Sequence, residues 1–257
     1  MRNFILAANW KMHKNPKEAV QFFHDYLPKH LAFTPERANG SELRAVVFVP
    51  ALVLESSLRA VQGSSVQIGG QNIHHEIKGA FTGENSAAVL KSMGADWALV
   101  GHSERRTLFG ETDEQTGSKM KTAIDNGLMA MLCVGETLAE REAGETIKVV
   151  ARQLEAGLAQ ISETVKVTPK RVAIAYEPVW AIGTGKVATP DQATEVHQSI
   201  RHWLASRFDN SVAKEISILY GGSVKPDNAA SIAAKPDIDG FLVGGASLEP
   251  ASFAALC

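Results

Sequence analysis

Eight short apolar segments recur along the chain, and they limit its possible folds more than any other feature of the sequence. Most are continuously apolar rather than alternating, which is typical of strands buried on both faces of a parallel sheet. Longer amphipathic segments separate them, and we expect these to form helices that cover the sheet. The eight predicted strands lie at residues 4–8, 44–49, 66–70, 96–101, 128–135, 171–177, 216–222 and 239–245.

Several of the separating segments show helical features. One apolar stripe at helical spacing comprises Ala19, Phe22, Phe23, Tyr26 and Leu27, and a longer one comprises Ile147, Val150, Ala151, Leu154, Leu158 and Ile161. Two further helices have recognisable starts. Thr137 with Glu140, and Thr189 with Gln192, have the spacing of a capping box, and Pro190 suits the first helical position.

Eight strand–helix units in 257 residues predict an α/β protein with a closed (β/α)8 barrel. An open doubly wound sheet is the structural alternative. The first strand, however, runs into "ANWKMHKN" rather than the glycine-rich fingerprint that binds dinucleotides in such sheets. Because no segment rich in Pro or Ser divides the chain, we expect a single domain over residues 1–257.

Composition argues against several classes of function. The net charge of −2 provides no basic field that would attract nucleic acid. No apolar run approaches the ~20 residues that span a bilayer, and the start "MRNFILAANWK" becomes polar too soon for a secretory signal. The two cysteines, Cys133 and Cys257, make no disulfide framework, so we expect a cytoplasmic protein.

Polar or glycine residues lie at or just after the ends of five predicted strands. Asn9 and Lys11 follow the first strand, His102 and Glu104 the fourth, and Ser223 the seventh, while Glu177 ends the sixth, and Gly244 and Gly245 end the eighth. In a closed parallel barrel these ends meet at one face, where catalytic groups lie. We therefore expect them to form one site.

Most of these residues also have a purely structural interpretation. Lys11 is consistent with a solvated loop lysine, His102 with a core histidine or a helix-start residue, and Glu177 with the partner of a nearby arginine. The glycine pairs at 221–222 and 244–245 are consistent with tight turns. Pro178, directly after Glu177, is hard to explain in a buried strand and favours a functional interpretation there.

This set of groups suits proton transfer next to a carbonyl. A carboxylate can remove a proton from carbon, an imidazole can polarise the carbonyl, and an ammonium can stabilise the developing negative charge. Backbone N–H groups at glycine-flanked turns suit a phosphate. The sequence has no metal-ligand spacing of the HExxH or CxxC kind, and this chemistry needs neither a metal nor a redox cofactor.

Seven segments of the chain resemble the triosephosphate isomerase family in their order and spacing. They are "AANWKMHK", "QNIHHEIKGAFTGENS", "GHSERR", "CVGET", "AYEPVWAIGTGK", "YGGSV" and "FLVGGASL". The resemblance covers the whole chain. It implies a single-domain TIM barrel that interconverts dihydroxyacetone phosphate and D-glyceraldehyde 3-phosphate through an enediolate, in glycolysis and gluconeogenesis and without a cofactor.

The resemblance also implies roles for individual residues. Glu177 matches the base, and His102 matches a neutral electrophile, because the start of the following helix disfavours a second proton. Asn9 and Lys11 match residues that hold the substrate and stabilise the oxyanion, with Glu104 paired near Lys11. The residues that match backbone donors to the phosphate are Gly183, Ser223, Gly244 and Gly245.

A homodimer and a mobile lid are further implications of the resemblance. The segment "QNIHHEIKGAFTG" (71–83) matches a loop that enters a pocket of the second chain, with Thr82 near Asn9 and Lys11 of the partner subunit. We expect its Ile73, Ile77 and Phe81 to form an exposed apolar patch that favours association. Residues 178–186 match the lid.

Two other functions remain as alternatives. One is an aldolase that uses Lys11 to form a Schiff base with a ketose phosphate. The other is a non-catalytic protein that binds phosphate ligands on the same scaffold. The presence of Asn9, Lys11, His102 and Glu177 together argues against the second.

Overall fold

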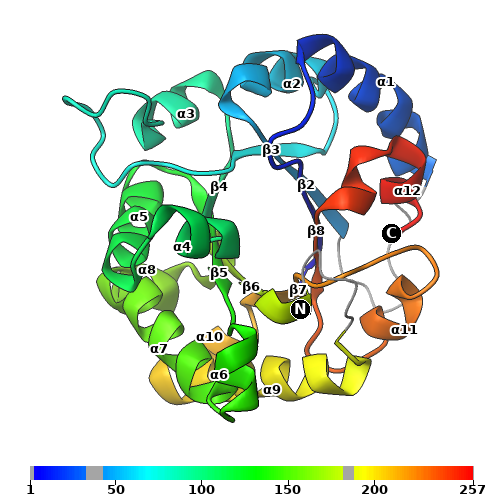
Figure 1. Cartoon of the computed structure of the whole chain (residues 1–257). Coiled ribbons are helices and arrows are strands. Elements are labelled where there is room, and N and C mark those ends of the chain that lie inside the picture. The colour runs from blue at the N-terminus through cyan, green and yellow to red at the C-terminus, as the bar shows by residue number, and fades with distance from the viewer. Residues whose placement is uncertain (1–2, 33–42, 182–187, 257) are drawn as a thin grey trace.

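Eight parallel strands close into a barrel in the computed structural model of the chain, which describes residues 3–32, 43–181 and 188–256 (Figure 1). Each strand pairs with its neighbours in sequence order, and β8 returns to β1. The strands are β1 (Phe4–Asn9), β2 (Leu43–Val49), β3 (Gln67–Gly70), β4 (Trp97–Val100), β5 (Met129–Val134), β6 (Val172–Tyr176), β7 (Ser217–Tyr220) and β8 (Gly240–Val243). The predicted (β/α)8 barrel is confirmed, and the open sheet is excluded.

Helices surround the barrel (Figure 1). The α-helices of the described residues are α1 (Pro16–Ala32), α2 (Leu54–Ala60), α3 (Ala87–Met93), α4 (Ser103–Phe109), α5 (Asp113–Asp125), α6 (Leu138–Glu142), α7 (Thr146–Leu158), α8 (Ser162–Val167), α9 (Pro190–Arg207), α10 (Asn210–Ala213), α11 (Ala229–Ala233) and α12 (Pro250–Ala254). Short 3-10 helices are η1 (Ala51–Val53), η2 (Ala159–Ile161), η3 (Pro169–Arg171), η4 (Val179–Ala181) and η5 (Gly245–Leu248). Within the described ranges, no helix is both long enough and apolar enough to cross a membrane.

Both predicted capping boxes are present. The Thr137 hydroxyl accepts the Glu140 N–H at the start of α6, and Thr189 does the same for Gln192 at the start of α9, in each case with the reciprocal bond. Four residues of the apolar stripe predicted around α7 are buried, namely Val150, Leu154, Leu158 and Ile161, whereas Ala151 is half-buried. Ile147 is exposed, contrary to the prediction.

The strands divide the core into two layers. Alternate residues of a strand point to opposite faces, so Ile5 and Ala7 of β1 lie inside the barrel while Leu6 and Ala8 pack against the helices. The interior layer also contains Trp97 from β4. A polar residue that continues an inward-facing series beyond the end of a strand therefore lies at the mouth of the barrel.

The loop after β3 extends outward beside α3 (Figure 1). Its first part is anchored, since the His74 N–H donates to the Asn85 carbonyl at 2.8 Å. The expectation that Ile73 is exposed is wrong, because Ile73 is fully buried in the layer between barrel and helices. Ile77 and Phe81 are exposed as predicted, and the Phe81 ring packs on His74 with 4.1 Å between ring centroids.

Candidate active site

The mouth of the barrel holds a cavity of about 440 Å³. Asn9 continues the inward-facing series of Ile5 and Ala7, and Glu177 continues that of Ala173 and Ala175. The cavity is lined by Asn9, Lys11, His102, Glu177, Gly221, Gly222, Ser223, Val224, Lys225, Leu242, Val243, Gly244, Gly245 and Ala246. The strand ends thus bring together in one cavity side chains that lie far apart in the sequence.

The Glu177 carboxylate is buried, and both of its oxygens are engaged. Oε1 lies 3.0 Å from His102 Nε2, and Oε2 accepts the Ser103 N–H at 2.9 Å. Its partners are therefore an imidazole and a helix-start amide rather than the arginine of the structural interpretation. Burial raises the pKa of Glu177, but the His102 and Ser103 interactions outweigh it and hold the pKa below its usual value.

His102 is the N-cap residue of α4. Its Nδ1 accepts the Glu104 N–H at 3.2 Å, so Nδ1 carries no proton and Nε2 is the donor toward Glu177. Burial lowers the pKa of His102, whereas the adjacent Glu177 carboxylate raises it, and the net direction is upward. The bond from the start of α4 fixes which nitrogen bears the proton in the neutral ring.

Lys11 reaches the cavity from a constrained backbone. Its φ of 51° is a left-handed conformation that is uncommon for a side chain of this size. Two bonds support it: the Lys11 N–H donates to Asn9 Oδ1 at 3.0 Å, and Gln71 Nε2 donates to the Lys11 carbonyl at 2.9 Å. Lys11 Nζ contacts Glu104 Oε1 at 2.5 Å, as the resemblance implies. This pairing is inconsistent with a simply solvated loop lysine.

The far side of the cavity is mostly backbone. Gly244 caps the 3-10 helix η5, and Gly245 begins it, so the first N–H groups of η5 have no acceptor within that helix. A Cβ at Gly245 would meet no protein atom within 4 Å and would take up cavity space. Ser223 lies beside these turns, and its hydroxyl donates to the Ala181 carbonyl at 3.3 Å. Gly183, with residues 182–186 of the predicted lid, lies outside the described residues.

Some residues of the site were not predicted from the sequence. Ser103 and Gln71 hold Glu177 and Lys11, and Lys225 adds a cation to the lining. The Ser103 contact had a recognisable signal, because the first N–H groups of a helix lack internal partners. Gln71 had none, since its neighbours Lys11 and Phe48 are distant in the sequence.

A buried glutamate supports the chain just after Glu177. Glu136 is fully buried and accepts hydrogen bonds from the Tyr176 hydroxyl (3.1 Å) and from Trp180 Nε1 (2.9 Å). Its carbonyl accepts the Val179 N–H at 3.2 Å. The β5–α6 junction therefore forms a platform for residues 177–180.

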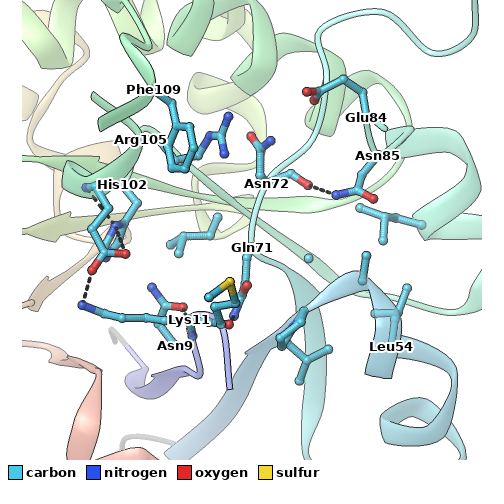
Figure 2. Close-up of a pocket in the computed structure, with 18 of the residues that line it drawn as sticks. Asn9, Lys11, Leu54, Gln71, Asn72, Glu84, Asn85, His102, Arg105 and Phe109 are labelled. Atoms are coloured by element: carbon cyan, nitrogen blue, oxygen red, sulfur yellow. Dashed lines mark hydrogen bonds and ion pairs between the residues drawn. The ribbon is translucent and has the colours of Figure 1, made fainter. Parts of the chain in front are cut away.

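A second cavity, of about 360 Å³, adjoins the first. Figure 2 shows Lys11 and His102 on one side of it and Glu84 and Asn85 on the other. Arg105 and Phe109, from α4, also line it. Asn9, Lys11 and His102 line both cavities and therefore lie between this outer cavity and the mouth of the barrel, whereas Glu104 lines the outer cavity alone.

Comparison with known proteins gives the family of the chain. The family model described as triosephosphate isomerase matches residues 4–257. A triosephosphate isomerase of Bdellovibrio bacteriovorus is 48% identical over 254 residues, which cover 98% of each chain. The triosephosphate isomerase of Symbiobacterium thermophilum is 47% identical, and the match covers all of this chain and 96% of that protein. The triosephosphate isomerase of Solibacter usitatus is 44% identical, and the match covers all of this chain and 99% of that protein. The chain belongs to the triosephosphate isomerase family.

Proposed function

We propose that Glu177, His102, Lys11 and Asn9 carry out in this chain the reaction of its family, the interconversion of dihydroxyacetone phosphate and D-glyceraldehyde 3-phosphate. The chain is an isomerase of glycolysis. The observation that carries the assignment of residues is the Glu177–His102 contact of 3.0 Å at the mouth of the barrel, beside Lys11. It unites a base, an electrophile and a cation in one cavity.

Glu177 is the base in this proposal. It takes a proton from the carbon beside the substrate carbonyl and returns it to the neighbouring carbon, so the reaction is neutral in protons overall. Because its pKa is lowered, the carboxylate is ionised and ready to accept that proton at neutral pH. Both of its oxygens are engaged, one with His102 and one with Ser103, and these two contacts set the orientation of the carboxylate.

His102 and Lys11 act on the oxygens. The Nε2–H of His102 donates to the carbonyl oxygen as negative charge develops, and the ring carries a proton between the two oxygens of the enediolate. Lys11 Nζ and the Asn9 amide stabilise the same charge and hold the substrate. The Glu104 carboxylate pairs with Lys11 Nζ and holds it in place.

The phosphate lies against the far wall of the cavity. Backbone N–H groups of Ser223, Gly244 and Gly245 provide donors there, and the missing Cβ at Gly245 allows close approach of the phosphate. Gly183 is a further proposed donor by its match to the family.

The active form in this proposal is a homodimer in the cytoplasm. Met12 and Phe109, which line the outer cavity, are 95% and 68% exposed, an apolar surface that a second chain would cover. The loop at residues 71–83 presents its own exposed Ile77 and Phe81. We place this loop of one chain in the outer cavity of the other, with Thr82 near Asn9 and Lys11 of the partner subunit.

A coupled assay tests the proposal. Purified protein is incubated with D-glyceraldehyde 3-phosphate, and dihydroxyacetone phosphate is followed through its reduction by an NADH-linked dehydrogenase. We expect rapid turnover that Glu177→Gln abolishes. Borohydride trapping with dihydroxyacetone phosphate gives no adduct in the isomerase, whereas a covalent adduct at Lys11 would establish the aldolase. Phosphate-ligand binding without turnover would establish the non-catalytic protein.

A further inference from the structure

The buried side-chain amide of Gln153 holds the β5–α6 junction, which supports residues 177–180. Gln153 lies on α7 and is 5% exposed. Its Oε1 accepts the Gly135 N–H at 2.7 Å, and its Nε2 donates to the Gly135 carbonyl at 3.2 Å. Both ends of the amide therefore bind the backbone of one residue, between β5 and α6.

The Gln153 amide takes the place of a missing strand neighbour. The Glu177 N–H donates to the Val134 carbonyl at 2.7 Å and the Val179 N–H to the Glu136 carbonyl, so residues 134 and 136 face β6. In a parallel ladder the residue between them faces the opposite neighbour, here β4. That strand ends at Val100, and the chain has already entered α4 at Ser103. Gln153 therefore supplies the hydrogen bonds to the Gly135 N–H and carbonyl that a longer β4 would have supplied.

Gly135 also touches the backbone of Glu177. A Cβ built on Gly135 would lie 1.7 Å from the Glu177 carbonyl oxygen, so a shift of Gly135 acts directly on Glu177. On the other side, Ser103, Gly135, Gln153 and Val179 line a cavity of about 350 Å³. The backbone bonds of Val134 and Glu136 hold this segment on the β6 side, and the two Gln153 bonds hold Gly135 on the side of this cavity.

We propose that Gln153 is a positioning residue for the isomerase reaction. It fixes Gly135, and through Gly135 it sets the backbone position from which the Glu177 carboxylate reaches substrate carbon. Its bonds lie at the β5–α6 junction, away from Ser223, Gly244 and Gly245 at the β7 and β8 ends, to which we assign three of the proposed phosphate donors. The inference rests on the proposed role of Glu177 as the base.

Gln153→Met tests the inference, because it removes both hydrogen bonds while nearly preserving length and volume. A displacement of about 1 Å can cost ~100-fold in rate, and we expect kcat to fall by roughly 10- to 100-fold. The KM for triose phosphate and the inhibition constant of inorganic phosphate should stay within about twofold of wild type, because Gln153 contacts none of Ser223, Gly244 and Gly245.

Gln67→Met is the matched control. Gln67 Oε1 accepts the Trp97 Nε1–H at 2.9 Å at the start of β3, the opposite end of the barrel from the site. This variant also loses a glutamine hydrogen bond, and we expect it to lower the melting temperature without lowering kcat. A fall in kcat equal to that of Gln153→Met would show a general effect of stability and overturn the inference.

The positioning role of Gln153 would also be overturned if Gln153→Met kept the wild-type kcat or changed only KM. If Gln153→Met does not fold, Gln153→Asn is assayed in its place and judged by the same outcomes. Its shorter side chain keeps the amide but cannot reach the Gly135 backbone. Glu177→Gln is assayed in parallel. Normal activity of Glu177→Gln would contradict the assignment of Glu177 as the base. An inactive Glu177→Gln together with a fully active Gln153→Met would contradict only the positioning role of Gln153.

Discussion

At the scale of single residues, the site depends on a carboxylate that stays ionised although it is buried. Burial alone would favour the neutral acid, and the contacts of Glu177 with His102 and the Ser103 N–H reverse that preference. The arrangement gives a base with two defined hydrogen bonds rather than a hydrated one, and its function depends on the position of the carboxylate to within about 1 Å.

Shortening the base tests this dependence. Glu177→Asp withdraws the carboxylate by one methylene, and we expect the fold to persist while kcat falls by ~100-fold. Steady-state kinetics with D-glyceraldehyde 3-phosphate and a thermal melt measure the two effects separately. Wild-type kcat with a lower melting temperature would mean that Glu177 has a structural role only.

Replacing the imidazole tests the electrophile. We expect His102→Gln to lower kcat more than it raises KM, because the bond to the carbonyl oxygen strengthens as charge develops. His102 also lowers the pKa of Glu177, so its loss raises that pKa. The acidic limb of the kcat/KM profile should therefore move to higher pH. A change in KM alone, with an unmoved acidic limb, would reduce His102 to a binding group.

At the scale of elements, the loop after β3 is held at its base and exposed at its tip. Lys119 of α5 donates to Asn72 Oδ1 at 2.8 Å and to the buried Glu111 carboxylate at 2.5 Å, while Arg105 contacts Glu111 at 2.8 Å. These bonds join the start of the loop to α4 and α5. An anchored base with an apolar tip is suited to inserting into a second chain.

A charge at the tip should oppose that insertion. We expect Thr82→Arg to weaken the dimer and lower specific activity together, since a large cation would enter the cavity beside the Lys11 ammonium of the partner subunit. Sedimentation velocity and activity over a dilution series measure both. Thr168→Arg, an exposed threonine at the other end of the barrel, is the control and should change neither. A fully active wild-type monomer at assay concentration would contradict the proposal.

At the scale of the whole molecule, a buried histidine couples folding to pH. His197 of α9 packs against Tyr176 and Tyr220, and its Nδ1 donates to the Asp237 carbonyl at 2.9 Å. Its Nε2 has no hydrogen-bond partner among the described residues. Burial lowers the pKa of His197 from 6.5 to about 4, so the unfolded chain binds this proton more readily than the folded one.

Stability should therefore fall as the pH drops from 6.5 toward 4. The difference between the two pKa values corresponds to about 3 kcal/mol in full, of which about 2 kcal/mol is lost between pH 7 and 5. Urea unfolding at fixed protein concentration measures it, and His197→Gln should remove this part of the pH dependence. His202→Gln, an exposed histidine of the same helix, should keep it. Equal pH dependence in all three proteins would contradict the assignment.

Local sequence was enough to predict the barrel and the position of most site residues. Strand burial depends on apolarity over five or six neighbouring residues, and helix starts depend on residues three apart, as at Thr189 and Gln192. Once eight such strands are parallel, closure places Asn9 and Glu177 at the same mouth. Their roles, however, came from resemblance to a family rather than from spacing.

Only the tertiary structure decided which groups touch. Glu177 meets His102 and Ser103, some 75 residues earlier in the chain, and Gln153 binds Gly135 from another helix. Ile73 is buried although the surrounding loop projects outward. No local pattern encodes these contacts, because they depend on where separate strand ends stop around a closed ring. The sequence by itself determined the elements and their order, and the closure of the barrel determined the partners of each functional side chain.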